Sequence, residues 1–302
     1  MNVISLHDDR DRKLVWGEPP RRIVSLVPSD TYSLVRLGAL DRLVGRTRFC
    51  VEPAGEVEGI EEVGGTKDAD VERIVALEPD AVIANQEENT RGDIQRLEAA
   101  GIRVLVSFPR RVADGVGHLA RLARLLGVHP KGEMAPRALV AEAYRVHAAA
   151  EARRRERAPI RAFVPIWMDP LMTVNGETFI SDMLDLVGAQ NVFEDRPRRY
   201  PLAADLGKAP PLPPERVAGR DTRYPRVTLE EVEARAPEIV ILPDEPHAFT
   251  DADAAVFRAL DIPAARRGQV VTCDGKDLMW YGARGVEGIE RLRALIDAAR
   301  AE

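Results

Sequence analysis

The sequence predicts an α/β protein made of two three-layer lobes, each with a parallel sheet, joined by one long rigid α-helix. Short apolar runs alternate with stretches of helical spacing, which is typical of a parallel sheet covered by helices on both faces. Residues 134–157 are rich in Ala, Glu and Arg and contain no Gly, which favours a single long helix. A chain of 302 residues suits two lobes of ordinary domain size.

The first lobe begins with the apolar run 23–27, which is typical of a buried strand. Pro28, Ser29 and Asp30 end this run, and residues 31–40 then carry leucines at helical spacing. The other strands expected in this lobe are 43–45, 81–84 and 104–106, and its other helices are 71–77, 93–100 and 112–126.

The long helix over residues 134–157 would span roughly 30 Å, a length that suits a strut between lobes. Residues 195–223 have little periodicity and predict a long surface loop. The other elements expected in the second lobe are strands 162–167, 239–242 and 269–272 and helices 178–187 and 286–299. We therefore expect an N-terminal lobe over 1–130, an inter-lobe helix over 131–158 and a C-terminal lobe over 159–302.

An internal repeat links the two lobes. Residues 71–83 (VERIVALEPDAVI) match residues 229–241 (LEEVEARAPEIVI) without a gap, and each copy reads as a short helix, a proline and a buried strand. An acidic loop follows each strand: Asn85, Gln86, Glu87 and Glu88 in the first copy, and Pro243, Asp244 and Glu245 in the second. Ligands of open parallel sheets bind beyond the carboxyl ends of the strands, so we expect both loops to line one cleft between the lobes.

The composition excludes several classes of function. The formal net charge of −6 does not indicate a nucleic-acid surface, and no apolar run approaches the length that spans a bilayer. Cys50 and Cys273 are expected to be reduced thiols, because they lie far apart in the sequence and belong to no metal-ligand cluster. Acidic residues interrupt the N-terminal stretch, which predicts a cytoplasmic protein, or a periplasmic one if a signal peptide has been removed.

Several stretches together resemble the class III solute-binding proteins for cobalamin, ferric siderophores and haem, also called helical-backbone metal receptors. The resemblance covers nearly the whole chain and implies two α/β lobes, a rigid helix between them and a ligand held in the cleft. The stretches that carry it are 22–29 (RIVSLVPS), 37–39 (LGA), 43–45 (LVG), 63–65 (VGG), 72–74 (ERI), 79–83 (PDAVI), 167–176 (WMDPLMTVNG), 179–180 (FI) and 224–225 (YP).

The resemblance implies roles for individual residues. Glu72 and Glu230 match the two glutamates that pair with arginines of an ABC permease in members that serve an importer. The alternative interpretation is that both glutamates are first-turn helix residues, which the helix dipole favours. Phe49, Trp167 and Tyr224 match positions that are aromatic in cobalamin binders, and Trp280 and Tyr281 are candidates from the last loop.

The sequence departs from the cobalamin-binding pattern at Thr66 and Asn85, where the cobalamin binders have aromatic residues. A flat macrocycle gains affinity from aromatic area, so this cleft would suit a corrinoid less well. The added carboxylates favour a cationic or polar ligand, or a metal complex with donor groups.

Two further hypotheses concern the same cleft. His247, with Glu87, Glu88 and Cys50 from the other lobe, could assemble a metal site of mixed donors, whereas His118 reads as a surface or packing residue of its helix. Glu87 and Glu245 could act as acid and base of an enzyme, but the sequence contains no nucleophile elbow, phosphate loop or zinc-protease motif.

The function predicted is a solute-binding protein, not an enzyme, that holds a metal chelate or tetrapyrrole-like cofactor, with an ABC permease as candidate partner. A corrinoid, a ferric chelate and a metal ion all remain open as the bound group. A cytosolic metal or cofactor receptor or chaperone is the alternative. The expected ligand-binding residues are Phe49, Cys50, Asn85, Gln86, Glu87, Glu88, Trp167, Tyr224, Asp244, Glu245, Trp280 and Tyr281.

Overall fold

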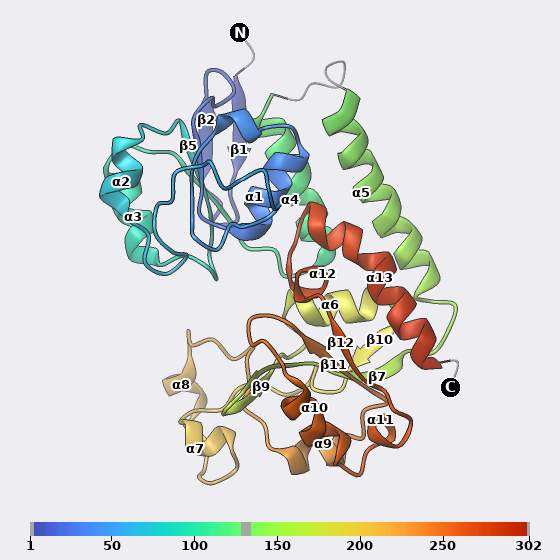
Figure 1. Cartoon of the computed structure of the whole chain (residues 1–302). Coiled ribbons are helices and arrows are strands. Elements are labelled where there is room, and N and C mark those ends of the chain that lie inside the picture. Colours follow the sequence, from blue (N-terminus) through green and yellow to red (C-terminus); the bar gives the residue numbers. More distant parts are fainter. Residues whose placement is uncertain (1–2, 128–133, 301–302) are drawn as a thin grey trace. The chain divides into compact units, whose positions relative to one another are not determined.

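The computed structural model describes residues 3–127 and 134–300, and these form two compact units (Figure 1). The first unit comprises Met1–Pro109, Ala113–His147 and Trp280–Val286, and the second comprises Arg110–Val112, Ala148–Met279 and Glu287–Glu302. The chain therefore passes between the units several times. The predicted domain boundaries stay a prediction, and the one at residue 130 lies outside the described residues.

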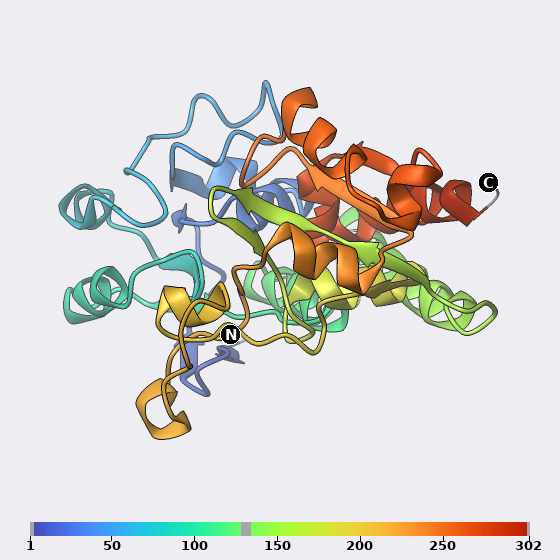
Figure 2. The same ribbon diagram turned by 90° about the horizontal axis from the view of Figure 1, so that it is seen from below.

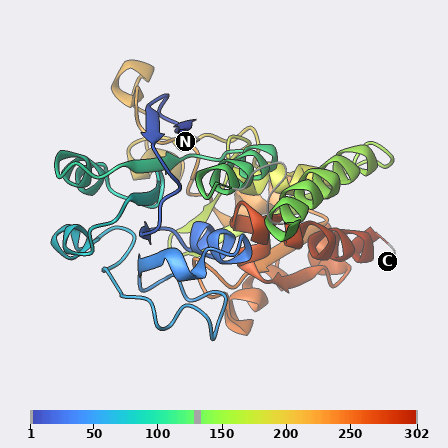
Figure 3. The same ribbon diagram turned by 90° about the horizontal axis from the view of Figure 1, so that it is seen from above.

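The first unit is built on a four-stranded parallel sheet with the strand order β4-β3-β5-β6. All residues of the inner strand β5 are buried, in agreement with a sheet covered on both faces. Viewed from above (Figure 3), α2 and α3 lie on one side of the sheet, and α1 and α4 lie on the other. The elements are β3 (Ile23–Ser25), α1 (Pro28–Arg36), a 3₁₀ turn (Leu40–Arg42), β4 (Leu43–Arg46), α2 (Val71–Ala76), β5 (Ala81–Asn85), α3 (Arg91–Ala99), β6 (Val104–Ser107) and α4 (Val112–Leu125).

The second unit has a four-stranded parallel sheet with the order β10-β7-β11-β12. Its core includes the fully buried rings of Phe163, Phe193 and Phe257, and the Phe163 centroid lies 5.4 Å and 5.8 Å from the other two. The elements are β7 (Ile160–Phe163), α6 (Phe179–Leu186), β10 (Ala189–Asn191), α9 (Leu229–Arg235), β11 (Ile239–Pro243), α10 (Asp251–Arg258), α11 (Pro263–Arg266), β12 (Val270–Cys273) and α12 (Gly275–Met279). Helix α13 (Ala283–Arg300) begins in the first unit and continues in the second from Glu287.

The internal repeat is a structural repeat. Helix α2 and strand β5 belong to the first sequence copy, and helix α9 and strand β11 are the corresponding elements of the second. Both strands occupy the third position in their sheets. Each helix begins at a side-chain cap, Asp70 for α2 and Thr228 for α9. Each copy also places a residue with positive φ directly before its proline, Glu78 at 48° and Ala236 at 44°. Two parallel α/β units, as predicted, are therefore confirmed.

The long helix is α5 (Met134–Arg153), which ends four residues before the predicted end. Its first part, through His147, belongs to the first unit, and its remainder belongs to the second. In the described residues, no helix combines the length and the apolar character needed to cross a membrane.

Two predicted elements are wrong in their details. Pro28 does not end a strand but opens α1, because a first-turn proline loses no helical hydrogen bond, and Gly38 at φ 80° follows the end of this helix. The single strand expected over 162–167 is two strands: β7 in the parallel sheet, and β8 (Pro165–Met168), which forms an antiparallel hairpin with β9 (Leu171–Thr173).

Two further features lie outside the predicted elements. An N-terminal hairpin pairs β1 (Ile4–His7) with β2 (Lys13–Trp16). Residues 195–223, expected as a surface loop, contain two single-turn helices, α7 (Leu202–Asp205) and α8 (Pro214–Val217). We call residues 195–223 the arm; Figure 2 shows its two short helices in yellow and gold.

Candidate functional site

The strands of a parallel sheet all end at one edge, and the loops after β4 and β5 form the tip of the first unit. Phe49 follows β4 with half of its surface exposed, and the Arg48 guanidinium lies 4.9 Å from the centre of its ring. Arg48 also forms two hydrogen bonds of 3.0 Å with the Asp68 carboxylate. An exposed aromatic ring held beside a paired cation can contact a ligand through its free face.

The acidic loop after β5 is held by an amide side chain. Asn85 Oδ1 accepts hydrogen bonds from the backbone N–H of Glu87 at 2.7 Å and of Glu88 at 3.2 Å. Gln86 and Glu88 are exposed and Glu87 is half-buried, whereas Asn85 is 2% exposed. Asn85 therefore shapes the loop, in which Gln86 and Glu88 are exposed to solvent.

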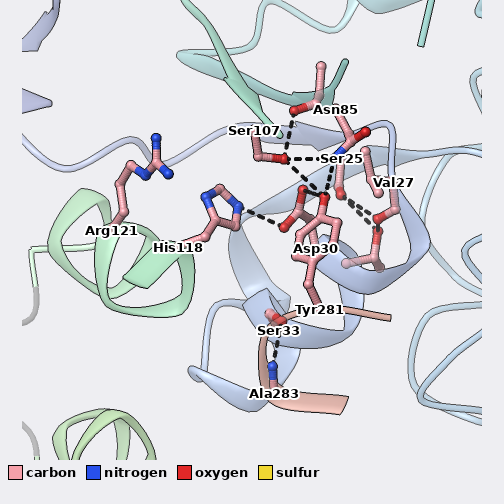
Figure 4. A network of polar contacts seen from close by, with 12 residues as sticks. Ser25, Val27, Asp30, Ser33, Asn85, Ser107, His118, Arg121, Tyr281 and Ala283 are labelled. Atoms are coloured by element: carbon pink, nitrogen blue, oxygen red, sulfur yellow. Dashed lines mark hydrogen bonds and ion pairs between the residues drawn. The ribbon is translucent and has the colours of Figure 1, made fainter. Parts of the chain in front are cut away.

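Beneath this loop lies a buried polar network (Figure 4). Tyr281 donates its hydroxyl to Asp30 Oδ2 at 2.9 Å, and His118 Nε2 lies 2.9 Å from Asp30 Oδ1. The Tyr281 hydroxyl also lies 3.0 Å from Ser107 Oγ and accepts from Asn85 Nδ2 at 3.2 Å. Burial first, and then the Asp30 carboxylate, raise the pKa of Tyr281 well above its usual value, so it acts as a neutral donor.

Four of the expected ligand-binding residues are buried in this structure, and their part in ligand binding stays a prediction. Cys50 is fully buried, with its Sγ 3.1 Å from Thr47 Oγ1, and burial raises the pKa of its thiol. Asn85 and Tyr281 belong to the buried network, and Trp280 packs edge-to-face on Tyr32 with a centroid distance of 6.4 Å. Asn85 and Cys50 lie at or near strand ends, and Trp280 and Tyr281 follow α12 in the last loop, as predicted, but all four side chains are buried.

The second unit presents an aromatic group at the corresponding edge. Trp167 on β8 is 42% exposed, and its Nε1 donates to the Asp169 carbonyl at 3.1 Å. The Trp167 ring centre lies 5.4 Å from that of His247, which lies 4.6 Å from that of Phe249. These ring contacts restrict the orientation of the Trp167 indole.

Asp244 and Glu245 follow β11 and pack on the start of α12. Asp244 Oδ1 accepts a 2.7 Å hydrogen bond from Gly275 N, and a Cβ at Gly275 would lie 2.5 Å from Glu245 Cγ. Asp244 is exposed and Glu245 is half-buried. Burial, followed by the carboxylates of Asp244, Asp277 and Asp274, raises the pKa of Cys273 to about 12. The tip of this unit is therefore acidic close to β11 and β12.

The metal site predicted around His247 stays a prediction, because Glu87, Glu88 and Cys50 belong to the other unit. The Nε2 of His247 lies 3.6 Å from Asp253 Oδ2, and its ring packs among the rings of Trp167 and Phe249. Across residues 3–127 and 134–300, no three His, Cys, Asp or Glu side chains are grouped as a metal ion requires. Glu87 belongs to the first unit and Glu245 to the second, so their interpretation as an acid–base pair stays a prediction.

The two candidate docking glutamates occupy equivalent places. Glu72 is the second residue of α2 and Glu230 is the second residue of α9, and both side chains are exposed. A hydrogen bond from its own backbone N–H and another from the Thr228 side chain lower the pKa of Glu230, so this carboxylate is ionised at neutral pH. An exposed negative charge at the same position of each repeat fits the docking interpretation, which stays a prediction.

Comparison with known proteins decides the family. The family model described as periplasmic binding protein matches residues 23–276, which include both parallel sheets and both tips. The chain belongs to this family. The result confirms the resemblance recognised in the sequence, and the family is one of binding proteins.

Individual relatives agree with this membership. The vitamin B12-binding protein of Vibrio parahaemolyticus is 26% identical over 256 residues, covering 84% of this chain and 81% of the relative. The vitamin B12-binding protein of Yersinia pestis is 29% identical over 227 residues, covering 75% of this chain and 70% of its own.

Solved structures show the same fold. The periplasmic vitamin B12-binding protein of Vibrio cholerae has a TM-score of 0.73 at 19% identity, covering 94% of this chain and 99% of that chain. A periplasmic haem-binding protein from Roseiflexus has a TM-score of 0.71 at 20% identity, covering 92% and 99%. The family's description does not support the cytoplasmic location predicted from the sequence and fits the periplasmic alternative.

Sequence reasoning missed Asp30, Ser107 and the contact of His118 with Asp30. His118 is 1% exposed and its Nδ1 has no hydrogen-bond partner among the described residues, so of the two predicted roles, surface or packing, it has the packing role. Asp30 and Ser107 carry one weak signal, because each lies at or just beyond the end of an apolar strand run. Their pairing with Tyr281 could not be read from local sequence.

Proposed function

We propose that this family member binds a metal chelate or tetrapyrrole-like cofactor of the cobalamin, ferric siderophore or haem class through the strand-tip residues of its two units. The observation that carries the proposal is the pair of half-exposed aromatic rings, Phe49 and Trp167, one at the tip of each unit. Large exposed aromatic rings are costly unless a partner covers them, and flat chelates gain affinity from such area.

The polar residues at the tips would set the ligand's orientation. Gln86, Glu87 and Glu88 in the first unit, and Asp244 and Glu245 in the second, offer carboxylate and amide groups beside the aromatic rings. Tyr224, half-buried with the Arg223 guanidinium 5.4 Å from its ring centre, is a further candidate contact. A few fixed polar groups around an apolar surface are typical of small-molecule sites.

Equilibrium titration with haem, cyanocobalamin and a ferric siderophore tests the proposal. Phe49→Ala and Trp167→Ala should each weaken binding of the preferred chelate about tenfold or more, because burial of an aromatic ring is worth about 1.5–3 kcal/mol. Tyr144→Ala removes an equally exposed aromatic side chain from α5 and should leave affinity unchanged. If no chelate of the panel binds at micromolar concentration, the proposed function is wrong.

We also propose that Glu72 and Glu230 dock the protein to an ABC permease outside the inner membrane. Glu72→Ala combined with Glu230→Ala should abolish chelate uptake by cells while the purified protein keeps its affinity. Glu156→Ala, which removes another exposed glutamate, is the matched control. Fractionation that finds the protein only in the cytosol would favour the cytosolic receptor instead.

A further inference from the structure

The outer face of a small β ribbon in the second unit carries an unusual combination of residues. β8 pairs with β9, and residue Met172 of β9 also bridges to Arg226 in an antiparallel manner. Trp167 is the partner of Met172 on the other side, so Trp167, Met172 and Arg226 stand in one row across three adjacent segments. Directly paired residues of antiparallel strands point to the same face.

This face is turned away from the core. Leu171, Thr173 and Val227, which alternate with the residues of the row, are almost fully buried, whereas Trp167 is exposed and Met172 and Arg226 are partly exposed. The alternation of buried and accessible residues therefore places an indole, a thioether and a guanidinium on one accessible surface.

Arg226 has no ion-pair partner among the described residues. Its backbone N–H donates to Asp205 Oδ2 at 2.7 Å and its Nη1 donates to the Tyr224 carbonyl at 3.3 Å, but its buried Nε has no acceptor. An unsatisfied buried donor on a charged group costs free energy, so it calls for an acceptor that the chain itself does not supply.

Arg198 adds a second positive charge nearby. Its guanidinium lies 4.5 Å from the centre of the Tyr200 ring, whose other cationic neighbour, Arg220, lies at 5.0 Å. Among the described residues Arg198 forms no salt bridge, but Asp221 lies close enough that its pKa is lowered, against burial, by Arg223 and also by the Arg198 charge. Loss of solvation, followed by the Arg198 charge, lowers the pKa of Arg226, whereas Asp205 and Tyr200 act to raise it.

Two of the arginines near this ribbon are paired. Arg196 is paired with Asp205 and Glu231, and Arg223 forms a two-point contact with Asp221. Arg198 and Arg226 form no salt bridge among the described residues, within a chain whose net charge is −6. Arg226, in the same row as the exposed Trp167 indole, matches a planar ligand that carries negative charge, and Arg198 adds a further positive charge.

We propose that Arg198 and Arg226 bind an anionic substituent of the ligand (a carboxylate, phosphate or catecholate oxygen) while its planar part lies on Trp167. The inference rests on the proposed function and refines its ligand class. It replaces the cationic or polar ligand that the acidic loops suggested with a chelate that bears anionic arms.

Ferric protoporphyrin IX and its dimethyl ester provide a matched pair of probes, because the ester has the same ring but no carboxylates. The wild-type protein should bind the free acid at least tenfold more tightly than the ester. Arg198→Met and Arg226→Met should each remove most of this preference, and Arg226→Lys should restore it only in part, since lysine lacks the two-point geometry. Arg216→Met, which removes an exposed arginine from α8 of the same arm, should keep the preference.

Stability measurements separate a ligand contact from a structural role. Arg198→Met loses the contact with the Tyr200 ring and Arg226→Met loses the hydrogen bond to the Tyr224 carbonyl, so each variant should lower the melting temperature of the unliganded protein by only a few degrees. Loss of the cooperative unfolding transition in either variant would show a structural role and overturn the proposal. Equal binding of acid and ester by the wild type, or chelate binding that is unaffected by both methionine substitutions, would also overturn it while leaving the proposed function intact. Failure of haem, its ester, cyanocobalamin and a ferric siderophore to bind at all would instead reject both.

Discussion

Tyr281 joins residues that are far apart in the chain. Its hydroxyl bridges Asp30, Ser107 and Asn85 inside the first unit, and the Asp30 contact spans 251 positions of sequence. Through Asn85, this network also determines the conformation of the acidic loop. A change at a fully buried residue should therefore affect both stability and the tip.

Tyr281→Phe removes the donor to Asp30 and should lower the free energy of unfolding by about 1–3 kcal/mol, because a buried carboxylate oxygen loses its partner. Urea denaturation measures this loss. Tyr144→Phe, at a position that is 51% exposed, should change it by less than about 0.5 kcal/mol. Equal effects of the two substitutions would mean that the network adds nothing to stability.

Cys273 should be almost inert as a nucleophile. With its pKa raised to about 12 by burial and then by Asp244, Asp277 and Asp274, only about one molecule in ten thousand carries the thiolate at pH 8. In a Cys50→Ala background, iodoacetamide should modify the native protein far more slowly than the urea-unfolded protein, and the rate should rise about tenfold per pH unit from pH 7 to 9. Rapid modification at pH 8 would show that the thiol is not shielded.

The positions of the tip residues were predicted from the sequence more accurately than the directions of their side chains. Phe49 and Gln86–Glu88 follow strand ends as predicted, Trp167 lies on the short strand β8, and all of them are accessible or partly so. Asn85 and Cys50 occupy similar places but point inward. A strand buried on both faces has no alternating pattern in its sequence, so the direction of the first residues beyond it depends on packing that local sequence does not encode.

At the scale of elements, the arm is held by one buried cation. Arg196 is 2% exposed, and its guanidinium donates to Asp205 Oδ1 at 2.9 Å and to Glu231 Oε1 at 2.7 Å. Asp205 in turn accepts from the backbone N–H groups of Arg199 and Arg226, so it links both ends of the arm. The arm therefore has a fixed base even though its helices are single turns.

Arg196→Met should destabilise the protein by about 3–5 kcal/mol, because it leaves the Asp205 carboxylate buried without a counter-charge. Limited proteolysis should then cut within residues 197–222 much faster than in the wild type. Arg266→Met breaks an exposed pair with Asp261 and should change stability by less than about 1 kcal/mol. Unchanged proteolysis in Arg196→Met would show that the arm is anchored by other contacts.

Element types were more predictable than element boundaries. The repeat over residues 71–83 and 229–241 predicted α2, β5, α9 and β11 because both copies combine helical spacing, a proline and an apolar run. The three-residue strand β10 was missed, since Ala189, Gln190 and Asn191 have low strand propensity and their strand conformation depends on pairing with β7, which is distant in sequence.

At the scale of the whole molecule, two copies of one α/β design present accessible aromatic and acidic residues at their strand tips. A ligand that binds only the folded state must stabilise it by mass action, by about 2.7 kcal/mol when its concentration is a hundred times Kd. The preferred chelate should therefore raise the melting temperature in proportion to the logarithm of its concentration. Trp167→Ala should need a correspondingly higher concentration for the same shift, and an identical dose response would exclude Trp167 from the site.

The most direct test of chelate binding is native mass spectrometry of the protein purified from its own host. The proposed function predicts a one-to-one complex with a metal chelate or tetrapyrrole, depleted in Trp167→Ala and retained in Tyr144→Ala. Detection of only the bare polypeptide, both as purified and after incubation with haem, cyanocobalamin and a ferric siderophore, would contradict it.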